Sequence, residues 1–90
     1  MIYNYGFTID KVGINEEWLN IEESPGKLNK VFYRHRSEDI LEFYSLIPKR
    51  QQENMEVSLG TDALIVSLGS MLQVETLDIV WREKIQKLST

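Results

Sequence analysis

The stretch from Glu17 to Arg36, EWLNIEESPGKLNKVFYRHR, decides the fold. Its centre, SPGK, suits a type II turn, because Pro25 fixes a negative φ and Gly26 accepts the positive φ that the next position requires. The flanking segments, Glu17–Glu23 and Leu28–Arg36, contain many residues that favour strands. The first segment also has apolar residues at helical spacing, but the turn after it favours a strand. We therefore predict a β-hairpin.

A third strand is predicted upstream of this hairpin, at Ile2–Ile9. Aromatic and apolar side chains alternate there with Asn4, Gly6 and Thr8, and this period of two is typical of a half-buried strand. The DKVG segment then provides a turn into the hairpin. The first 36 residues thus predict a three-stranded antiparallel meander.

A helix is predicted after the meander, followed by a short strand. Ser37 suits the N-cap, acids follow it in the first turn, and Pro48 ends the pattern. The apolar positions that define its face are Ile40, Phe43, Tyr44 and Ile47. Beyond a polar loop, Met55–Leu59 alternates apolar and polar residues and predicts a fourth strand.

The C-terminal third begins with the apolar run ALIVSLGSML at Ala63–Leu72. This run fits a helix or a buried strand, and its length favours the helix. A final helix follows, with an apolar stripe that includes Leu77, Trp81, Ile85 and Leu88. Gly69-Ser70 either kinks one long helix or separates two. The predicted fold is one α+β domain over residues 1–90, ordered β-β-β-α-β-α-α, with a small antiparallel sheet of three to four strands packed against C-terminal helices.

The composition excludes several classes of function. Hydrophobic residues make up 42% of the 90-residue chain, which is typical of a globular protein, and the formal net charge of −4 disfavours non-specific binding to nucleic acid or to an anionic membrane. The chain has no cysteine, so disulfides, thiolate metal sites and thiol nucleophiles are absent. Because the first ten residues also lack a signal-peptide pattern and the apolar run is too short to cross a membrane, we expect a cytoplasmic protein.

No motif for catalysis, metal binding or cofactor binding is present, so we predict a protein that is not an enzyme and needs no cofactor. His35 is the only histidine, and nothing in the sequence supplies it with a nucleophile and an orienting acid. The paired acids lack the loop spacing of a cation site, and the glycines are isolated. A helix-turn-helix at 61–83 would bring Glu75 and Asp78 against phosphates, which disfavours reading of DNA.

A basic cluster is the one candidate for nucleic-acid binding. It consists of Lys27, Lys30, Arg34, His35 and Arg36. Phe32 and Tyr33 lie among these residues, and such a mixture of cations and stacking surfaces can hold single-stranded nucleic acid. Nearby acids offset these charges, so we expect this function only as a weaker alternative.

The aromatic residues supply the strongest functional signal. Two tryptophans, four tyrosines and the apolar run exceed what one side of a small sheet accommodates, and such a surplus is typical of protein interfaces. The leading hypothesis is a non-enzymatic protein-binding module, such as a small bacterial or phage-encoded inhibitor, immunity or anti-defence protein, or regulator. Its predicted anchors for a protein partner or a homodimer are Leu77, Trp81, Ile85 and Leu88. A structural subunit of a homo-oligomeric assembly, such as a virion component, is the alternative.

Overall fold

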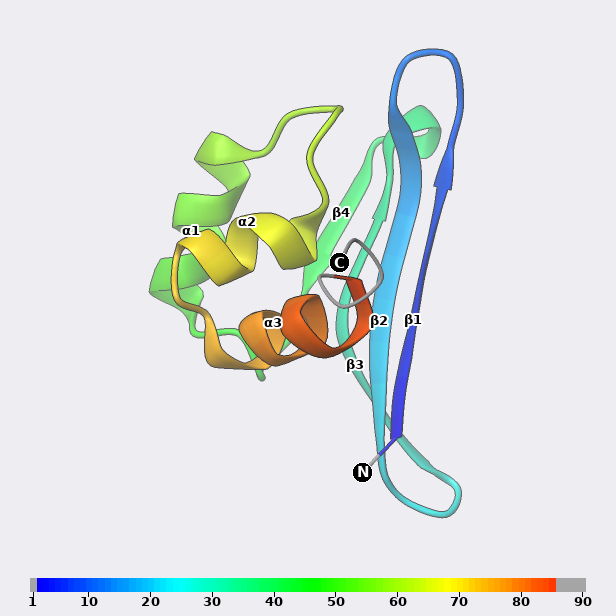
Figure 1. The fold of residues 1–90 in the computed structure, drawn as a ribbon, viewed down its shortest axis with the longest axis vertical. Coiled ribbons are helices and arrows are strands. Elements are labelled where there is room, and N and C mark those ends of the chain that lie inside the picture. The colour runs from blue at the N-terminus through cyan, green and yellow to red at the C-terminus, as the bar shows by residue number, and fades with distance from the viewer. Residues whose placement is uncertain (1, 86–90) are drawn as a thin grey trace.

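A computed structural model describes residues 2–85 of the chain. Within this range the protein has two layers, a four-stranded antiparallel sheet and three α-helices that cover one of its faces (Figure 1). The strands are β1 (Ile2–Ile9), β2 (Ile14–Ser24), β3 (Lys27–His35) and β4 (Ile40–Phe43). The helices are α1 (Lys49–Ser58), α2 (Ile65–Met71) and α3 (Glu75–Val80), which continues into the π-helical turn η2 (Trp81–Ile85). The predicted α+β class, a small sheet against C-terminal helices, is confirmed.

The sheet is a meander in which the spatial order β1-β2-β3-β4 follows the chain. The predicted hairpin is confirmed as β2 and β3, and Gly26 has the positive φ of 81° that the turn required. Strand β1 pairs with β2 over most of its length, with Tyr5 opposite Leu19 and a register shift between Thr8 and Ile9. The sequence-based prediction of three consecutive antiparallel strands therefore holds.

The core lies between the helices and the face of the sheet that they cover. Leu19 and Phe32 are opposite each other in β2 and β3, and neither has exposed surface. The register shifts beside them, which leaves Val31 as an extra residue, so that the adjacent residues Val31 and Phe32 are both buried. The other buried members of the cluster are Ile21, Ile47, Met55, Ile65, Val66, Val74, Leu77 and Val80.

The predicted helix from Ser37 to Ile47 is wrong. A single 3₁₀ turn at Arg36–Glu38 is followed by Asp39 in the left-handed conformation, with φ of 56°, and the chain then reverses into β4. Strand β4 places Leu41 opposite Arg34 and Phe43 opposite Phe32, so the apolar positions serve a strand. The helical spacing was real, but pairing with β3 overrides it.

The predicted strand at Met55–Leu59 is also wrong, because this segment continues α1. The helix begins directly after Pro48, which has the N-cap position. Proline is well tolerated at the start of a helix. Pro48 is predicted to end a helix, but it precedes the first residue of α1. Met55 is buried, whereas Val57 is 89% exposed, so the alternation of apolar residues did not reflect a strand.

The apolar run forms a helix, which answers the question that the sequence left open. Helices α2 and α3 are separate, and the break lies at Gln73, with φ of 60°, and not at Gly69-Ser70. Gly69 is buried against Leu77, and a Cβ atom at position 69 would lie 2.4 Å from Leu77 Cδ1. The glycine therefore allows α2 and α3 to approach closely.

Candidate functional site

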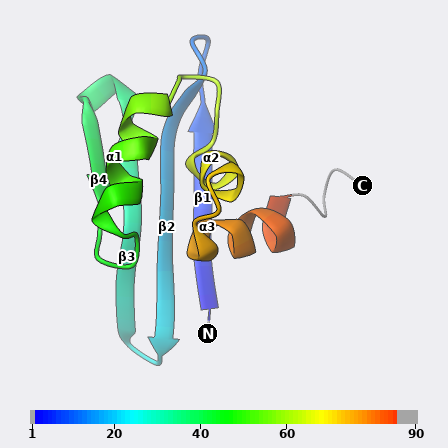
Figure 2. The same cartoon turned by 90° about the vertical axis from the view of Figure 1, so that its left-hand side faces the viewer.

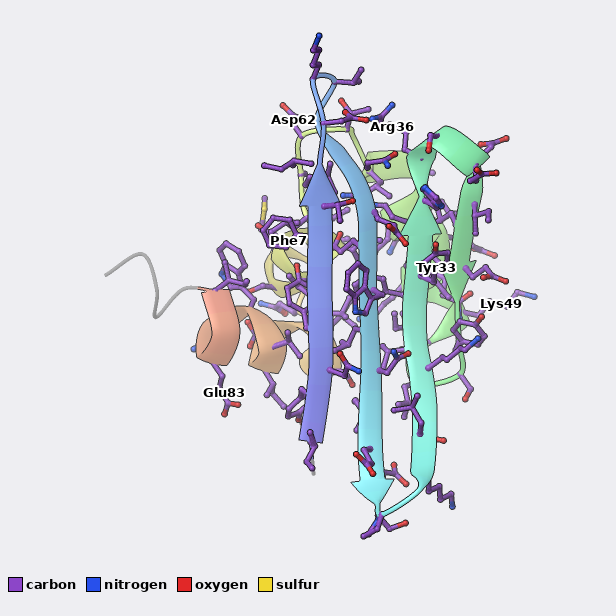
Figure 3. The ribbon with its side chains drawn as sticks, turned by 90° about the vertical axis from the view of Figure 1, so that its right-hand side faces the viewer. Phe7, Tyr33, Arg36, Lys49, Asp62 and Glu83 are labelled. Atoms are coloured by element: carbon purple, nitrogen blue, oxygen red, sulfur yellow. The ribbon has the colours of Figure 1, made fainter. Side chains whose placement is uncertain are left out.

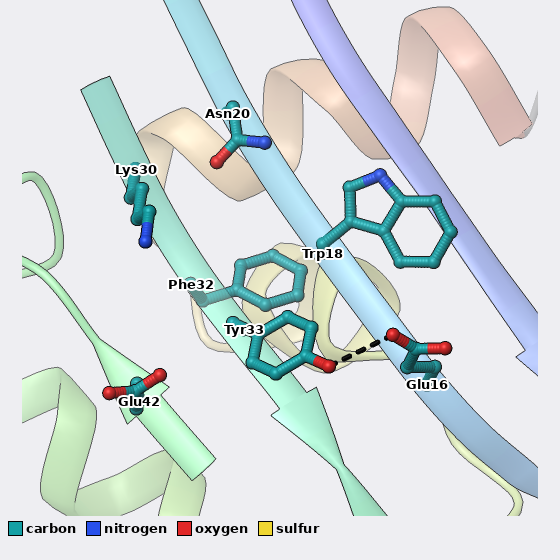
Figure 4. A pocket seen from close by; sticks show the side chains of 7 residues that line it. All are labelled: Glu16, Trp18, Asn20, Lys30, Phe32, Tyr33 and Glu42. Carbon is teal, nitrogen blue, oxygen red and sulfur yellow. Dashed lines mark hydrogen bonds between the residues drawn. The ribbon is translucent and has the colours of Figure 1, made fainter. Parts of the chain in front are cut away.

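The candidate site lies on the face of the sheet that the helices leave uncovered, which we call the open face. Because side chains alternate along a strand, the neighbours of the buried Leu19 point away from the helices, and so does Tyr33 beside the buried Phe32, whereas the bulged Val31 on the other side of Phe32 is buried. The outward-pointing side chains form a shallow hollow of about 440 Å³ (Figure 4). Its lining consists of Glu16, Trp18, Asn20, Lys30, Phe32, Tyr33 and Glu42.

Trp18 is the largest side chain of the open face, and Gly6 positions it. The two residues are direct partners in the β1–β2 pairing. A Cβ atom at Gly6 would lie 2.3 Å from Trp18 Cζ2, so the indole lies directly on the backbone of β1. Only glycine leaves room for this arrangement, since any side chain at position 6 would displace the ring.

Tyr33 is the second aromatic residue of the open face and lies opposite Trp18 in the β2–β3 pairing. Its hydroxyl donates a hydrogen bond of 2.9 Å to Glu16 and lies 3.3 Å from Nδ1 of His35. The hydrogen bond to Glu16 raises the pKa of the Tyr33 hydroxyl. The same hydrogen bond fixes the position of the Tyr33 ring beside the indole.

Charged side chains of both signs surround the two aromatic rings. Glu42 in β4 is the strand partner of Tyr33. Lys30 in β3 has its ammonium 6.0 Å from the centre of the Tyr44 ring. Figure 4 shows Glu16, Glu42 and Lys30 at three separate places around the border of the hollow. The hollow thus has an aromatic centre and a charged rim, an arrangement typical of protein interfaces.

A separate buried polar cluster lies on the helix-covered face, where Glu17 and Arg34 are paired across β2 and β3. Arg34 Nη2 lies 3.3 Å from Glu17 Oε1, and Glu17 has no exposed surface. The Glu17 carboxylate also accepts hydrogen bonds from the Tyr5 hydroxyl at 2.9 Å and from the backbone N–H groups of Ile65 and Val66 at 2.6 and 3.3 Å. Glu17 therefore caps the first turn of α2 from the sheet.

This cluster holds the fold together, and its groups are directed at the chain itself. Arg34 donates to the carbonyl oxygens of Gly60, at 3.3 Å, and Ala63, at 2.6 Å, and so fixes the loop before α2. Burial raises the pKa of the Glu17 carboxyl and of the Tyr5 hydroxyl, and it lowers the pKa of the Arg34 guanidinium. Such shifts also occur at active sites, and Arg34 lines a hollow of about 220 Å³ together with Leu41 and Gly60. We assign the cluster to structure because the Glu17 carboxylate, the Tyr5 hydroxyl and both Nη atoms of Arg34 bond to partners within the chain itself.

The predicted basic cluster is dispersed. Arg34 points to the helices, and Arg36 bonds to Asp10 and to the carbonyl of Ile14. Lys27 lies at the β2–β3 turn, while Lys30 and His35 are on the open face among acidic neighbours. The five residues do not line one surface, and the nucleic-acid alternative loses the stripe of positive charge on which it rested.

The predicted anchors of the final helix have different positions. Leu77 is 0% exposed and belongs to the core, so the chain's own packing already covers it, and it is not available to a partner. Trp81 and Ile85 are half-buried and pack against the edge of the same core. Leu88 lies outside the described residues. The prediction that Trp81 and Ile85 contact a partner stays a prediction.

Comparisons of this chain with protein families, with curated proteins and with solved structures return no match. Within residues 2–85, no three His, Asp or Glu side chains are grouped so that they could hold a metal ion. Over the same range no helix has the length and apolar character that a membrane span needs.

Proposed function

We propose that this protein is a non-enzymatic binding module that docks a protein partner on the open face of its sheet. The observation that carries the proposal is the Trp18–Tyr33 pair, held in place by Gly6 and Glu16 beside an uncovered hollow. Tryptophan and tyrosine contribute much of the binding energy at protein interfaces. Here both rings are fixed in advance, so binding would lose little side-chain entropy.

The charges of the open face suggest the chemistry of the partner's contact. Glu16 and Glu42 provide carboxylates at the border of the hollow, and the two rings provide π surfaces. An arginine or lysine side chain fits both features, because a cation is attracted to an aromatic face and to a carboxylate. We therefore expect a partner that places a basic side chain over Trp18 and Tyr33.

The proposal of binding without catalysis rests on how the titratable groups are used. The Tyr33 hydroxyl donates a hydrogen bond to Glu16 and lies within hydrogen-bond distance of His35. This trio orients the ring and leaves no activated nucleophile. An inhibitor, an immunity or anti-defence protein, or a small regulator would use such a surface, and we expect it to act in the cytoplasm.

The test is to capture a partner from the native cell with variants that keep the fold. Glu42→Lys reverses one exposed charge at the hollow, and Glu56→Lys makes the same change on the exposed side of α1. The Glu42 variant should lose the wild-type partner at physiological salt, whereas the Glu56 control should retain it. Equal capture by both variants would contradict the proposal. Circular dichroism verifies that each variant is folded.

A structural subunit of a homo-oligomeric assembly is the second candidate function. It is favoured by a different observation, the open edge of the sheet at β1, which has no described partner strand. A protein whose edge strand pairs with another copy would be monomeric only at low concentration.

A further inference from the structure

We propose that two copies of this chain pair through β1, in antiparallel orientation and centred on Tyr5, to form one continuous sheet. Strand β1 is an edge of the sheet, because it pairs with β2 on one side and no described strand pairs with the other side. The proposal concerns an interface separate from the open-face hollow.

The two edges of the sheet differ strongly. Strand β4 is short, with four residues, and carries Glu42, and short charged edges resist pairing with other chains. Strand β1 has eight residues, IYNYGFTI, and none of them is charged. It lacks the lysines, prolines and inward-facing charges with which monomeric proteins usually protect an edge. Strand β4 is thus protected by its short length and its charge, whereas β1 has neither protection.

The sequence of β1 suits pairing with itself. Its regular part runs from Ile2 to Thr8, because the register shifts between Thr8 and Ile9, and Tyr5 is the middle residue of this part. A two-fold axis perpendicular to the sheet at Tyr5 would place Tyr3 opposite Phe7 of the second copy. It would also place Ile2 opposite Thr8. Aromatic residues would then meet aromatic residues, and such cross-strand pairs stabilise sheets.

This arrangement keeps the two faces of the sheet consistent. Tyr3, Tyr5 and Phe7 point to the helix-covered side, since they alternate with Gly6, which lies under Trp18 on the open face. A perpendicular two-fold axis places both helix layers on the same side. Apolar side chains at the edge are already exposed, with Phe7 at 42% and Ile2 at 62%. A second copy would cover them without bringing like charges together.

The helix layer also extends beyond the β1 edge. Figures 2 and 3 show α3 and η2 projecting past β1, away from β2, and Figure 3 shows Phe7 at this edge. In a symmetric pair, the helices of each copy already cover its own first strands, so the projecting helices of the two copies would meet each other above the paired strands. Trp81 and Ile85 belong to this projection, and both are only half-buried within the single chain. The predicted role of the final helix in self-association would thus be combined with strand pairing.

The test is the molar mass of the full chain by light scattering over a hundredfold range of concentration, with Phe7→Lys as the variant. The control is Val57→Lys on α1, at another exposed apolar residue. Wild type and control should be dimers. Phe7→Lys should raise the dimer dissociation constant by roughly 10- to 100-fold, because the symmetric interface contains the substitution twice. A monomeric wild type, or a dimer that Phe7→Lys leaves unchanged, would overturn the proposal.

Engineered cysteines test the register, since the chain has none of its own. Oxidation of a mixture of Ile2→Cys and Thr8→Cys chains should give mainly mixed cross-linked dimers, because residue 2 would face residue 8 at a distance that a disulfide spans. Neither variant alone should cross-link beyond the level of a Val57→Cys control. Efficient cross-linking of Ile2→Cys with itself would indicate parallel pairing or another register and would overturn the proposal.

Discussion

Removal of the Glu17 carboxylate should destabilise the protein strongly, because this group is buried and paired. Glu17→Ala leaves Arg34 buried without its anion, and breaking a buried pair in this way costs about 3–5 kcal/mol. The backbone N–H groups of Ile65 and Val66 lose their acceptor as well. A domain of this length has a total stability of roughly 5–13 kcal/mol, so the variant should lose a quarter or more of it.

Urea unfolding followed by circular dichroism measures this loss. Glu16→Ala is the matched control, because this adjacent residue lies on the open face and both it and its partner Tyr33 are only partly buried. The control should shift the urea midpoint only slightly. A loss below about 1 kcal/mol for Glu17→Ala, the value of an ordinary hydrogen bond, would refute the assignment of Glu17 as the cap of α2.

The pH dependence of an Arg34→Met variant tests the same cluster from the other side. Burial already raises the pKa of Glu17 in the folded state, and removal of the cation should raise it further. A raised carboxyl pKa favours the folded state below the unfolded pKa, and this contribution is lost as the pH rises through the folded pKa. The variant should therefore be less destabilised at pH 5 than at pH 8. An equal loss at both values would contradict the account.

The remaining predictions concern packing and surface charge. Gly6→Ala should displace the Trp18 indole, because the new Cβ would overlap the ring. The change should appear in tryptophan emission when measured in a Trp81→Phe background, and an unchanged emission would argue against the close contact. Leu77→Ala should cost about 2–5 kcal/mol in urea unfolding, because the side chain is fully buried, whereas Trp81→Ala should cost less and leave a folded chain. The pKa of Asp78 is lowered by hydrogen bonds from Ser70 and Arg82, so its stabilising effect is present above the unfolded pKa and disappears as the pH falls through the folded pKa. Asp78→Asn should therefore lower the melting temperature at pH 7 and have little effect near pH 2, and a pH-independent difference would contradict this assignment.

The sequence predicts the parts of the fold that depend on local chemistry. The β2–β3 hairpin follows from Pro25 and Gly26, which determine the turn without reference to the rest of the chain. Strand β4 could not be predicted in the same way, because its four residues become a strand only through pairing with β3. The left-handed conformation of Asp39, which directs the chain into β4, has no clear signal in the sequence.

The candidate site could be predicted only in part. The sequence marks Trp18 and Tyr33 as surplus aromatic residues. Alternation along the strands places them on the other face of the sheet from Glu17 and Arg34. Their position beside each other depends on the β2–β3 register, which a bulge at Val31 shifts by one residue. The role of Glu17 is even less visible, since its amide donors lie 48 and 49 residues further along the chain.

The meander has a consequence for synthesis of the protein. All strands are complete by Phe43, and the helices begin only at Lys49. On the ribosome the sheet can form first, since each strand pairs with its neighbour in the chain. Until α2 and α3 emerge, Leu19 and Phe32 face water and the Glu17 carboxylate has no amide donors. The nascent chain therefore presents an apolar sheet surface until these helices pack on it.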